Sequence, residues 1–277
     1  MALPVALQLY SVRDEVEEDL RGTLLKVKQM GYTGVEFAGL YNNKPSDIKV
    51  MLEEIGLIAV SAHVGLELIL ESPEKVIGEY ATIGCKFIAI PYLSDESRPG
   101  KEGFTQTIKD IEVVAKEAKK HGIQLLYHNH DFEFVKLDGG EYGLDAIYRL
   151  VPSDLLKTEI DTCWVNVAGL NPSEYIGKYS GRSPVVHLKD FVMKGKEKPA
   201  HLYELIGIQS DKDETASEEA FGFRSVGHGV QDFPAILDAS VQAGAEWVVV
   251  EQDRPTPGLT PMECVKLSRD YLAKLGW

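Results

Sequence analysis

The stretch that decides the fold is Leu125-Leu126-Tyr127-His128-Asn129-His130-Asp131-Phe132-Glu133-Phe134. It opens with apolar residues typical of a buried strand and follows His121-Gly122, which end a helical pattern. Two histidines, an asparagine and two carboxylates crowd its carboxyl end. Because side chains alternate along a strand, we expect His128 and His130 on one face and Asn129 on the other. In parallel α/β folds, ligands bind at this end of the strands.

The alternation of a short strand with a helical segment extends over the whole chain. Glycines such as Gly31, Gly56 and Gly84 stand where each helix should end. Eight strands are predicted at residues 5–10, 34–37, 57–63, 86–91, 123–129, 156–161, 184–189 and 247–251. Eight helical segments are predicted at residues 14–30, 46–55, 73–83, 105–120, 144–150, 172–179, 233–243 and 261–275. We therefore predict an α/β protein with a (β/α)8 TIM barrel, as one domain over residues 1–277.

A doubly wound open sheet is the alternative architecture. We disfavour it because no glycine-rich phosphate loop follows the first predicted strand. One connection is long, from about residue 191 to residue 230. On the catalytic face of a barrel, a connection of that length usually carries a lid or part of the binding site. Its charged centre, Asp211-Lys212-Asp213-Glu214, is more simply a solvated loop tip.

Composition disfavours several classes of function. The chain has 277 residues and a net charge of −14, which would repel the phosphate backbone of nucleic acid. We find no signal-peptide pattern and no apolar run near the roughly 20 residues that span a bilayer. We therefore expect a soluble, cytoplasmic protein with neither nucleic acid nor membrane as a partner. Cys85, Cys163 and Cys264 lack CxxC spacing, so we expect neither a disulfide framework nor a cysteine zinc site.

If the barrel is correct, polar residues at the strand ends converge on one mouth. They are Gln8, Tyr10, Glu36, His63, His128, His130, Glu159, Asp161, His187, Lys189, Glu251 and Asp253. Burying such groups is costly unless they are paired or bind a metal ion. Asp, His and Glu from separate strands suit one divalent ion such as Mn²⁺, Mg²⁺, Co²⁺ or Zn²⁺. For any single residue, a hydrogen-bond network between strands is an equal alternative.

A series of short motifs gives the chain a family resemblance. They are Leu7-Gln8-Leu9-Tyr10-Ser11, Gly34-Val35-Glu36-Phe37, His128-Asn129-His130-Asp131, Glu159-Ile160-Asp161-Thr162, His187-Leu188-Lys189-Asp190, Gly227-His228-Gly229 ahead of Asp232-Phe233, and Val250-Glu251. With these motifs the chain resembles the xylose isomerase-like barrels known as sugar phosphate isomerases/epimerases, which include ketose 3-epimerases and inosose dehydratases. Each motif alone is weak, but their order and spacing together are specific for this superfamily.

The resemblance implies a metal ion held at the ends of the last four strands, usually by Glu, Asp, His and Glu. Asp161, His187 and Glu251 match the last three ligands, and the first falls on or beside His128. Glu133 is a second candidate for that position. In the epimerases, the first and fourth carboxylates exchange the substrate proton, so His128 puts a symmetric two-carboxylate exchange in doubt.

The activity that the resemblance implies is a divalent-metal-dependent sugar or inositol-derivative isomerase/epimerase. It would remove the proton α to a carbonyl and pass through an enediolate. His128, His130 and Glu251 are the candidate bases, and an imidazole suits this task near neutral pH. The expected substrate-binding residues are Gln8, Glu36, His63 and Glu159 for hydroxyls, Trp164 for the apolar ring face, and Lys189 for a carboxylate or oxyanion. His63 as a wall histidine and Trp164 as a core aromatic are equal alternatives.

Other functions remain alternatives. With His128 in place of a carboxylate, a one-base route ending in β-elimination is credible, so a dehydratase or lyase on keto-sugars or 3-keto-glycosides is the first. A non-catalytic sugar-binding barrel is the second. A hydrolase of the apurinic endonuclease type shares the barrel but needs more metal-binding histidines and a cationic face.

Features of the substrate and the assembly are also predicted. We expect a small sugar or polyol as the substrate. The resemblance allows a homodimer, because barrels of this type often pair through surface helices and loops. No phosphate clamp is evident, which favours a free sugar over a phosphorylated one. The arginines considered for a clamp are dispersed: Arg13, Arg98, Arg182, Arg224 and Arg254.

Overall fold

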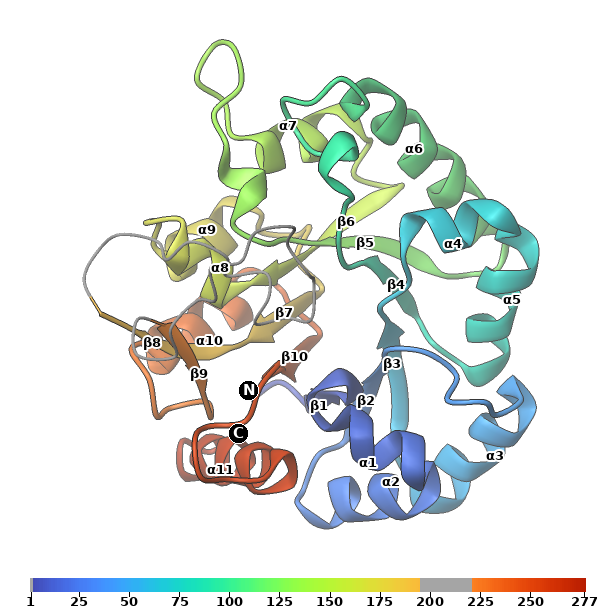
Figure 1. Ribbon diagram of the computed structural model, residues 1–277, viewed down its shortest axis with the longest axis vertical. Helices are drawn as coiled ribbons and strands as arrows, with labels where there is room; N and C mark the ends of the chain where they lie inside the picture. Colours follow the sequence, from blue (N-terminus) through green and yellow to red (C-terminus); the bar gives the residue numbers. More distant parts are fainter. Residues whose placement is uncertain (1, 195–220) are drawn as a thin grey trace, which may run out of the picture.

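The computed structural model describes residues 2–194 and 221–277, which form a (β/α)8 barrel (Figure 1). Its parallel strands are β1 (Val5–Gln8), β2 (Gly34–Phe37), β3 (Ile58–Ala62), β4 (Phe87–Ile90), β5 (Gln124–His128), β6 (Leu156–Asp161), β7 (Val185–Leu188) and β10 (Trp247–Val250). The strand order is β3-β2-β1-β10-β7-β6-β5-β4. His63 bridges to Ala89 between β3 and β4, which completes the circle. The predicted TIM barrel is confirmed and the doubly wound alternative is excluded, whereas the single domain over residues 1–277 stays a prediction.

Each predicted helical segment is present with differences in its bounds, and two short helices at residues 66–71 and 162–167 were not predicted. They are α1 (Arg13–Glu18), α2 (Leu20–Gln29), α3 (Pro45–Ile55), α4 (Leu66–Glu71), α5 (Pro73–Ile83), α6 (Phe104–Lys120), α7 (Gly143–Leu150), α8 (Thr162–Val167), α9 (Pro172–Lys178), α10 (Phe233–Gln242) and α11 (Pro261–Lys274). The helix predicted over residues 14–30 is divided, because Asp19 lies between α1 and α2 and caps α2 by accepting a hydrogen bond from Gly22 N at 2.9 Å. The first strand ends at Gln8, because residues Leu9–Val12 form a 3₁₀ turn.

The long connection begins and ends in a β-hairpin that the sequence pattern did not predict. Strands β8 (Asp190–Met193) and β9 (Phe221–Arg224) pair antiparallel. Phe191, Phe221 and Phe223 are buried with Trp164 in an aromatic cluster. The hairpin therefore packs beside the barrel's α8 helix. The predicted charged loop tip at residues 211–214 lies outside the described residues.

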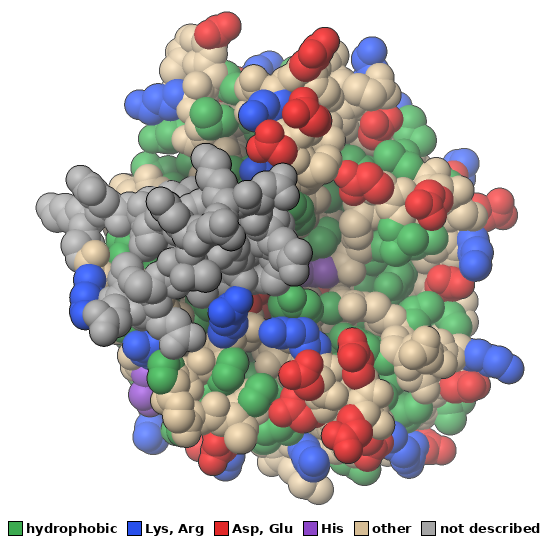
Figure 2. Space-filling view, viewed as in Figure 1, with side chains coloured by type: hydrophobic (Ala, Val, Ile, Leu, Met, Phe, Trp, Pro, Cys, Tyr) green, Lys and Arg blue, Asp and Glu red, His purple; other side chains and the backbone are tan. Residues whose placement is uncertain are grey.

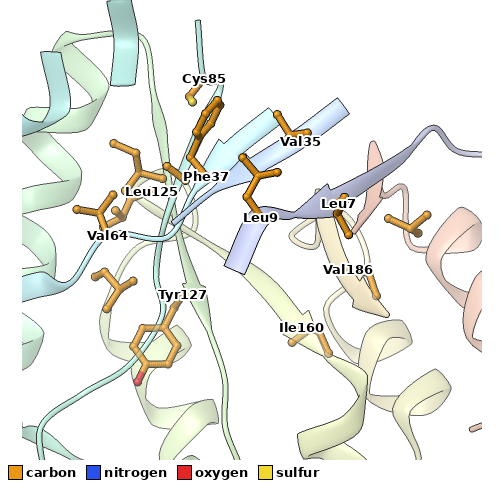
Figure 3. Close-up of a cluster of buried hydrophobic side chains, with 14 of the residues drawn as sticks. Leu7, Leu9, Val35, Phe37, Val64, Cys85, Leu125, Tyr127, Ile160 and Val186 are labelled. Carbon is orange, nitrogen blue, oxygen red and sulfur yellow. The ribbon is translucent and has the colours of Figure 1, made fainter. Parts of the chain in front are cut away.

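Two apolar layers hold the strands. One lies between the strands and the surrounding helices and includes Leu7, Val35, Leu125, Tyr127, Ile160 and Val186 (Figure 3). The other fills the inside of the barrel with Ala6, Val60, Phe87, Ala89, Leu126, Val185, Trp247 and Val249. The two layers take alternate residues of the same strands, as the two-residue period requires. The next inward position beyond Ala6, Leu126, Val185 and Val249 is polar in each strand, which places the site above the inner apolar layer.

The inner layer is tight at Gly34 of β2. A Cβ atom added there would lie 2.7 Å from Val60 Cγ2 and 3.0 Å from Trp247 Cζ3. Such distances are too short for carbon atoms that are not bonded. Glycine at this position therefore lets side chains from β3 and β10 meet inside the barrel.

Candidate metal centre and substrate cavity

Polar side chains from six strands meet inside the barrel. They are Gln8, Glu36, His128, Glu159, His187 and Glu251, and all are buried. Their contacts cross the barrel: His187 Nε2 lies 2.8 Å from Glu36 Oε1, and the Nε2 atom of His63 lies 2.7 Å from Glu159 Oε2. The structure thus brings the predicted strand-end residues together.

Two overlapping groups of side chains among the described residues could hold a metal ion. In each group the four ligand atoms lie within 4.8 Å of one another. The first group is the predicted set, His128, Asp161, His187 and Glu251. The second group is His63, His128, Glu159 and His187.

The two shared histidines use opposite ring nitrogens for the two groups. His187 directs Nδ1 toward Glu251 Oε2 at 3.1 Å and Nε2 toward Glu36. His128 directs Nε2 toward Asp161 Oδ2 at 3.8 Å and Nδ1 toward Glu159 Oε2 at 3.2 Å. Metal-bound histidines commonly donate their other N–H to a carboxylate, which fixes the ring and its tautomer. The geometry therefore suits one ion in the first group, with Glu36 and Glu159 orienting its histidines.

Asp161 provides a test of whether this first group suits a cation. Its Oδ2 atom is buried and has no hydrogen-bond partner in the described part of the chain. The 3.8 Å to His128 Nε2 is too long for a hydrogen bond but is close to the spacing of two ligands around one ion. The lone pair of Asp161 Oδ2 and the mixed oxygen and nitrogen donors of the first group fit a divalent metal ion.

Glu36 is held as a carboxylate at the base of the site. Gln8 Nε2 donates to Glu36 Oε1 at 2.6 Å, and the hydroxyl of Ser61 donates to Oε2. Burial opposes ionisation of Glu36, but His63 and His187 hold its pKa well below the ordinary value. The sequence reasoning missed Ser61, which has no distinguishing signal apart from its place in the predicted strand 57–63.

The histidines divide into two electrostatic types. Burial disfavours charge on His63, yet Glu36 and Glu159 raise its pKa to about 10, and the pKa of His187 is raised by the same carboxylates. Burial lowers the pKa of His128 and of His130 well below the ordinary value, aided by cationic neighbours. His128 and His130 are therefore neutral near pH 7 and have a nitrogen lone pair for a metal ion or a proton.

Lys189 is a buried cation surrounded by carboxylates. Its Nζ atom lies 2.8 Å from Asp253 Oδ2, 2.9 Å from Glu251 Oε2 and 3.5 Å from Asp161 Oδ2. Burial opposes its charge, but Asp253 and Glu251 raise the pKa of Lys189 well above the ordinary value. Lys189 thus remains an ammonium group and holds the Glu251 carboxylate in place.

Hydrogen bonds of Asn129 and Glu133 fix the loop after β5. Asn129 exchanges two hydrogen bonds with the backbone of Asp161, at 3.0 and 3.3 Å. Glu133 accepts from the Tyr127 hydroxyl at 2.7 Å through Oε1 and from His130 N at 2.8 Å through Oε2. Burial raises the pKa of Glu133 to about 8. Both oxygens of Glu133 are engaged away from the four candidate ligands, so the structure does not bring this residue into either described metal group.

A cavity of about 220 Å³ lies over the polar layer. Its described lining residues are Tyr10, Ala38, His63, Pro91, Tyr92, His128, His130, Lys189, Glu251 and Asp253. Figure 2 shows histidine atoms in a hollow near the middle of this face, with hydrophobic side chains beside it. Pro91 and Tyr92 were missed by the sequence reasoning, although they stand at and directly after the end of the predicted strand 86–91.

Four expected substrate-binding residues do not line this cavity. Gln8, Glu36 and Glu159 are fully buried in the layer beneath it. Trp164 is also fully buried, and its ring packs behind His130 with the ring centroids 5.2 Å apart. The substrate-binding role expected of these four residues stays a prediction.

No helix of residues 2–194 or 221–277 combines the length and apolar character needed to cross a bilayer.

Comparisons with known proteins identify the family of the chain and several similar proteins. A family model described as xylose isomerase-like TIM barrel matches residues 24–275. An inosose dehydratase from Geobacillus kaustophilus is 22% identical over 284 residues, covering 91% of this chain and 86% of that protein. The structure of a sugar phosphate isomerase/epimerase from Parabacteroides distasonis is similar, with a TM-score of 0.76, 22% identity, and coverage of 98% of this chain and 94% of that one. The IOLI protein with a bound zinc atom has a TM-score of 0.72, 15% identity, and coverage of 99% and 98%.

Proposed function

Because the chain belongs to the xylose isomerase-like TIM barrel family, we propose that it is a divalent-metal-dependent enzyme acting on a keto-sugar or inosose. The proposed reaction begins with removal of the proton α to the substrate carbonyl. The observation that carries this proposal is the four-residue group His128, Asp161, His187 and Glu251 at the floor of a cavity of about 220 Å³. The inosose dehydratase relative and the zinc-binding structural neighbour support it.

The proposed roles follow from placement and charge. The ion, when bound to the four residues, would act as a Lewis acid for the enediolate oxygen, a contribution of several kcal/mol. His130 lines the cavity and is neutral, so it is the proposed base for the α-proton. Glu251 is held by Lys189 and His187, which favours a ligand role for this residue over that of a mobile base. Lys189 would stabilise negative charge that develops on the substrate.

The second half of the reaction distinguishes an isomerase or epimerase from a dehydratase or lyase. An isomerase or epimerase must return the proton to a carbon atom. A dehydratase or lyase instead expels a β-oxygen substituent: the C–H electrons form the C=C bond, the C–O bond breaks, and the departing oxygen takes up a proton. Two points favour elimination: a relative is named inosose dehydratase, and the family resemblance puts the first ligand position, a carboxylate in the epimerases, on or beside His128. We therefore propose elimination as the second candidate beside isomerisation.

Proton exchange tests the shared first step. Metal-replete enzyme is incubated in D₂O with a panel of ketoses, inososes and 3-keto-glucosides, and deuterium at the α-carbon is followed by NMR. Exchange with a new ketose or epimer identifies an isomerase or epimerase, whereas loss of water or of an aglycone identifies a dehydratase or lyase. His130→Gln is expected to slow the exchange at least about 100-fold. Binding without any exchange across the panel would contradict the proposal and favour a sugar-binding barrel.

The remaining features of the protein stay predictions from the sequence. They are a free rather than phosphorylated sugar or polyol as the substrate, Mn²⁺, Co²⁺, Mg²⁺ or Zn²⁺ as the ion, a homodimer, and a cytoplasmic location.

A further inference from the structure

The rim of the cavity differs from its floor in chemistry. The floor residues His128, Lys189 and Glu251 are charged or polar and almost fully buried. The rim residues Tyr10 and Tyr92 are partly exposed. A ligand that fills the cavity therefore meets polar groups at its inner end and two aromatic rings at its outer end.

The two rim tyrosines stand on well-separated sides of the mouth. Tyr10 follows β1, and Tyr92 follows β4. In the eight-stranded sheet these strands are separated by β2 and β3 along one side of the circle. Tyr10 and Tyr92 therefore reach the same cavity from different parts of the barrel circle.

Each tyrosine ring is held by an arginine from outside the cavity. The Arg13 guanidinium carbon lies 4.4 Å from the centre of the Tyr10 ring. The Arg98 guanidinium carbon lies 5.0 Å from the centre of the Tyr92 ring, and Arg98 also donates to the Tyr92 hydroxyl. Neither arginine is among the described lining residues. The rings are therefore pre-organised, which reduces the entropy lost when a planar group packs on them.

Both arginines are already committed to the protein. Arg13 Nη1 donates to the carbonyls of Tyr10 at 3.0 Å and Asp253 at 2.9 Å. Arg98 donates through Nε to the Leu93 carbonyl at 3.1 Å and through Nη1 to Asp95 at 3.2 Å. These bonds hold both guanidinium groups against the protein, and those of Arg98 would have to be broken before it could bind a phosphate in the forked geometry that arginine uses.

The charged groups of the cavity also disfavour an anionic substituent. Lys189 is already paired with Asp161, Glu251 and Asp253, so a phosphate group would have to compete with these carboxylates for its ammonium group. Bringing a dianionic phosphate beside these carboxylates would add repulsion in a buried site. Aromatic rings, in contrast, gain from contact with an uncharged planar group.

We propose that the substrate is an uncharged glycoside-like sugar derivative with a planar apolar substituent, and that Tyr10 and Tyr92 bind this substituent at the rim. The inference rests on the proposed function only for the position of the sugar ring over the floor. It names the substrate class: an aryl or similarly planar glycoside rather than a sugar phosphate.

Binding measurements with three defined probes test the proposal. The probes are phenyl β-D-glucopyranoside, methyl β-D-glucopyranoside and glucose 6-phosphate, titrated into the metal-loaded full-length protein by calorimetry, with the α-anomers of both glycosides in parallel. The expected result is a phenyl glycoside that binds roughly tenfold more tightly than the methyl glycoside of the same anomer, with the phosphate weakest. Tyr10→Leu and Tyr92→Leu should each reduce this ratio about threefold or more.

Matched variants separate a rim contact from a folding defect. Tyr10→Phe and Tyr92→Phe keep the ring and should retain the phenyl preference. Tyr142→Leu removes a partly buried tyrosine that packs on Phe134, outside the cavity, and should not change the ratio. Equal affinity for phenyl and methyl glycosides, tighter binding of the phosphate, or no binding of any probe would each overturn the proposal.

The outcomes also separate this inference from the proposed function. Metal binding and α-proton exchange without a phenyl preference would overturn the rim proposal and leave the proposed function standing. A phenyl preference that depends on both tyrosines, in a protein without metal or exchange, would support the rim proposal and contradict the proposed function.

Discussion

The Nε2 atom of His187 lies 2.8 Å from Oε1 of Glu36, in a contact that crosses the barrel from β7 to β2. An ionised carboxylate has only acceptors, so Nε2 carries the proton in this contact. In the proposed metal site, a bound ion would displace the proton from Nδ1 of His187, and that nitrogen would then offer its lone pair toward the same space as Glu251. Glu36 thereby determines which nitrogen of His187 is available to a metal ion.

Replacing Glu36 should weaken metal binding without removing a ligand. We expect Glu36→Gln to lower the affinity for Zn²⁺ or Mn²⁺ about 10- to 100-fold, because the amide lacks the charge that makes His187 a stronger ligand. Competition against a chelating dye measures this change. Glu54→Gln, an exposed residue paired with Arg21, is the matched control and should bind like the wild type. An affinity of Glu36→Gln within twofold of the wild type would refute the orienting role.

The inner apolar layer should not tolerate a methyl group at Gly34. The added Cβ would meet Val60 and Trp247, so Gly34→Ala should reduce the free energy of unfolding by about 1–3 kcal/mol. Gly177→Ala is the control, because Gly177 is an exposed position in α9 with nothing within 4 Å of the added atom. That change should raise stability by about 0.5–1 kcal/mol. Urea unfolding compares the two variants, and a loss at Gly177 equal to that at Gly34 would contradict the packing argument.

Glu133 should make the free energy of unfolding decrease as the pH rises. Burial raises its pKa to about 8 in the folded protein, whereas an unfolded glutamate has a pKa of about 4.3. Between these values the folded state keeps a proton that the unfolded state has lost, so increasing pH favours unfolding. Glu133→Gln stays neutral and lacks this dependence. Its stability relative to the wild type should therefore improve by up to about 1.4 kcal/mol for each pH unit from 5 to 8.

Urea unfolding at pH 5.5 and pH 8.0, with chelator present for both proteins, measures this difference. Glu18→Gln, an exposed control in α1, should show the same pH dependence as the wild type. Parallel behaviour of Glu133→Gln and wild type between the two pH values would show that Glu133 is ionised in the fold. Unchanged metal content in Glu133→Gln is also expected, because its oxygens bind Tyr127 and His130.

The barrel was predictable because its signals are local. Strand-length apolar runs and helix-ending glycines such as Gly56 and Gly84, both with positive φ, recur in order along the chain. The placement of His128 and His130 on one face was also predictable, because the alternation of side chains along a strand does not depend on the other strands. Their rings do lie together, with centroids 5.3 Å apart.

Contacts between distant segments were not predictable. Nothing near Gly34 in the sequence indicates that Val60 and Trp247 meet over it. Asp190 is a similar case, since its carboxylate accepts hydrogen bonds from Gly227 N at 3.0 Å and Gly229 N at 2.8 Å. The Gly227-His228-Gly229 motif was visible in the sequence, but its partner became evident only in three dimensions.

The same distinction applies to the candidate site. The predicted barrel was enough to identify the strand-end residues. It did not indicate which of them line the cavity and which are buried beneath it. Trp164 is a residue type that often stacks on sugar rings. In the structure, however, its position in α8 buries it behind His130. Tyr92 was passed over because a tyrosine after a strand carries no charge signal, although it lines the cavity.

Metal content is the most direct test of the proposed metal centre. Protein purified without chelator is analysed for metals by elemental analysis beside an Asp161→Ala/His187→Ala double variant. Asp270→Ala/His121→Ala removes the same residue types outside the cavity and serves as the control, with circular dichroism to check folding. We expect about one equivalent of Mn, Co, Mg or Zn in the wild type and control, and its loss in the folded double variant. Equal metal content in all three proteins, or none in a metal-replete wild type, would contradict it.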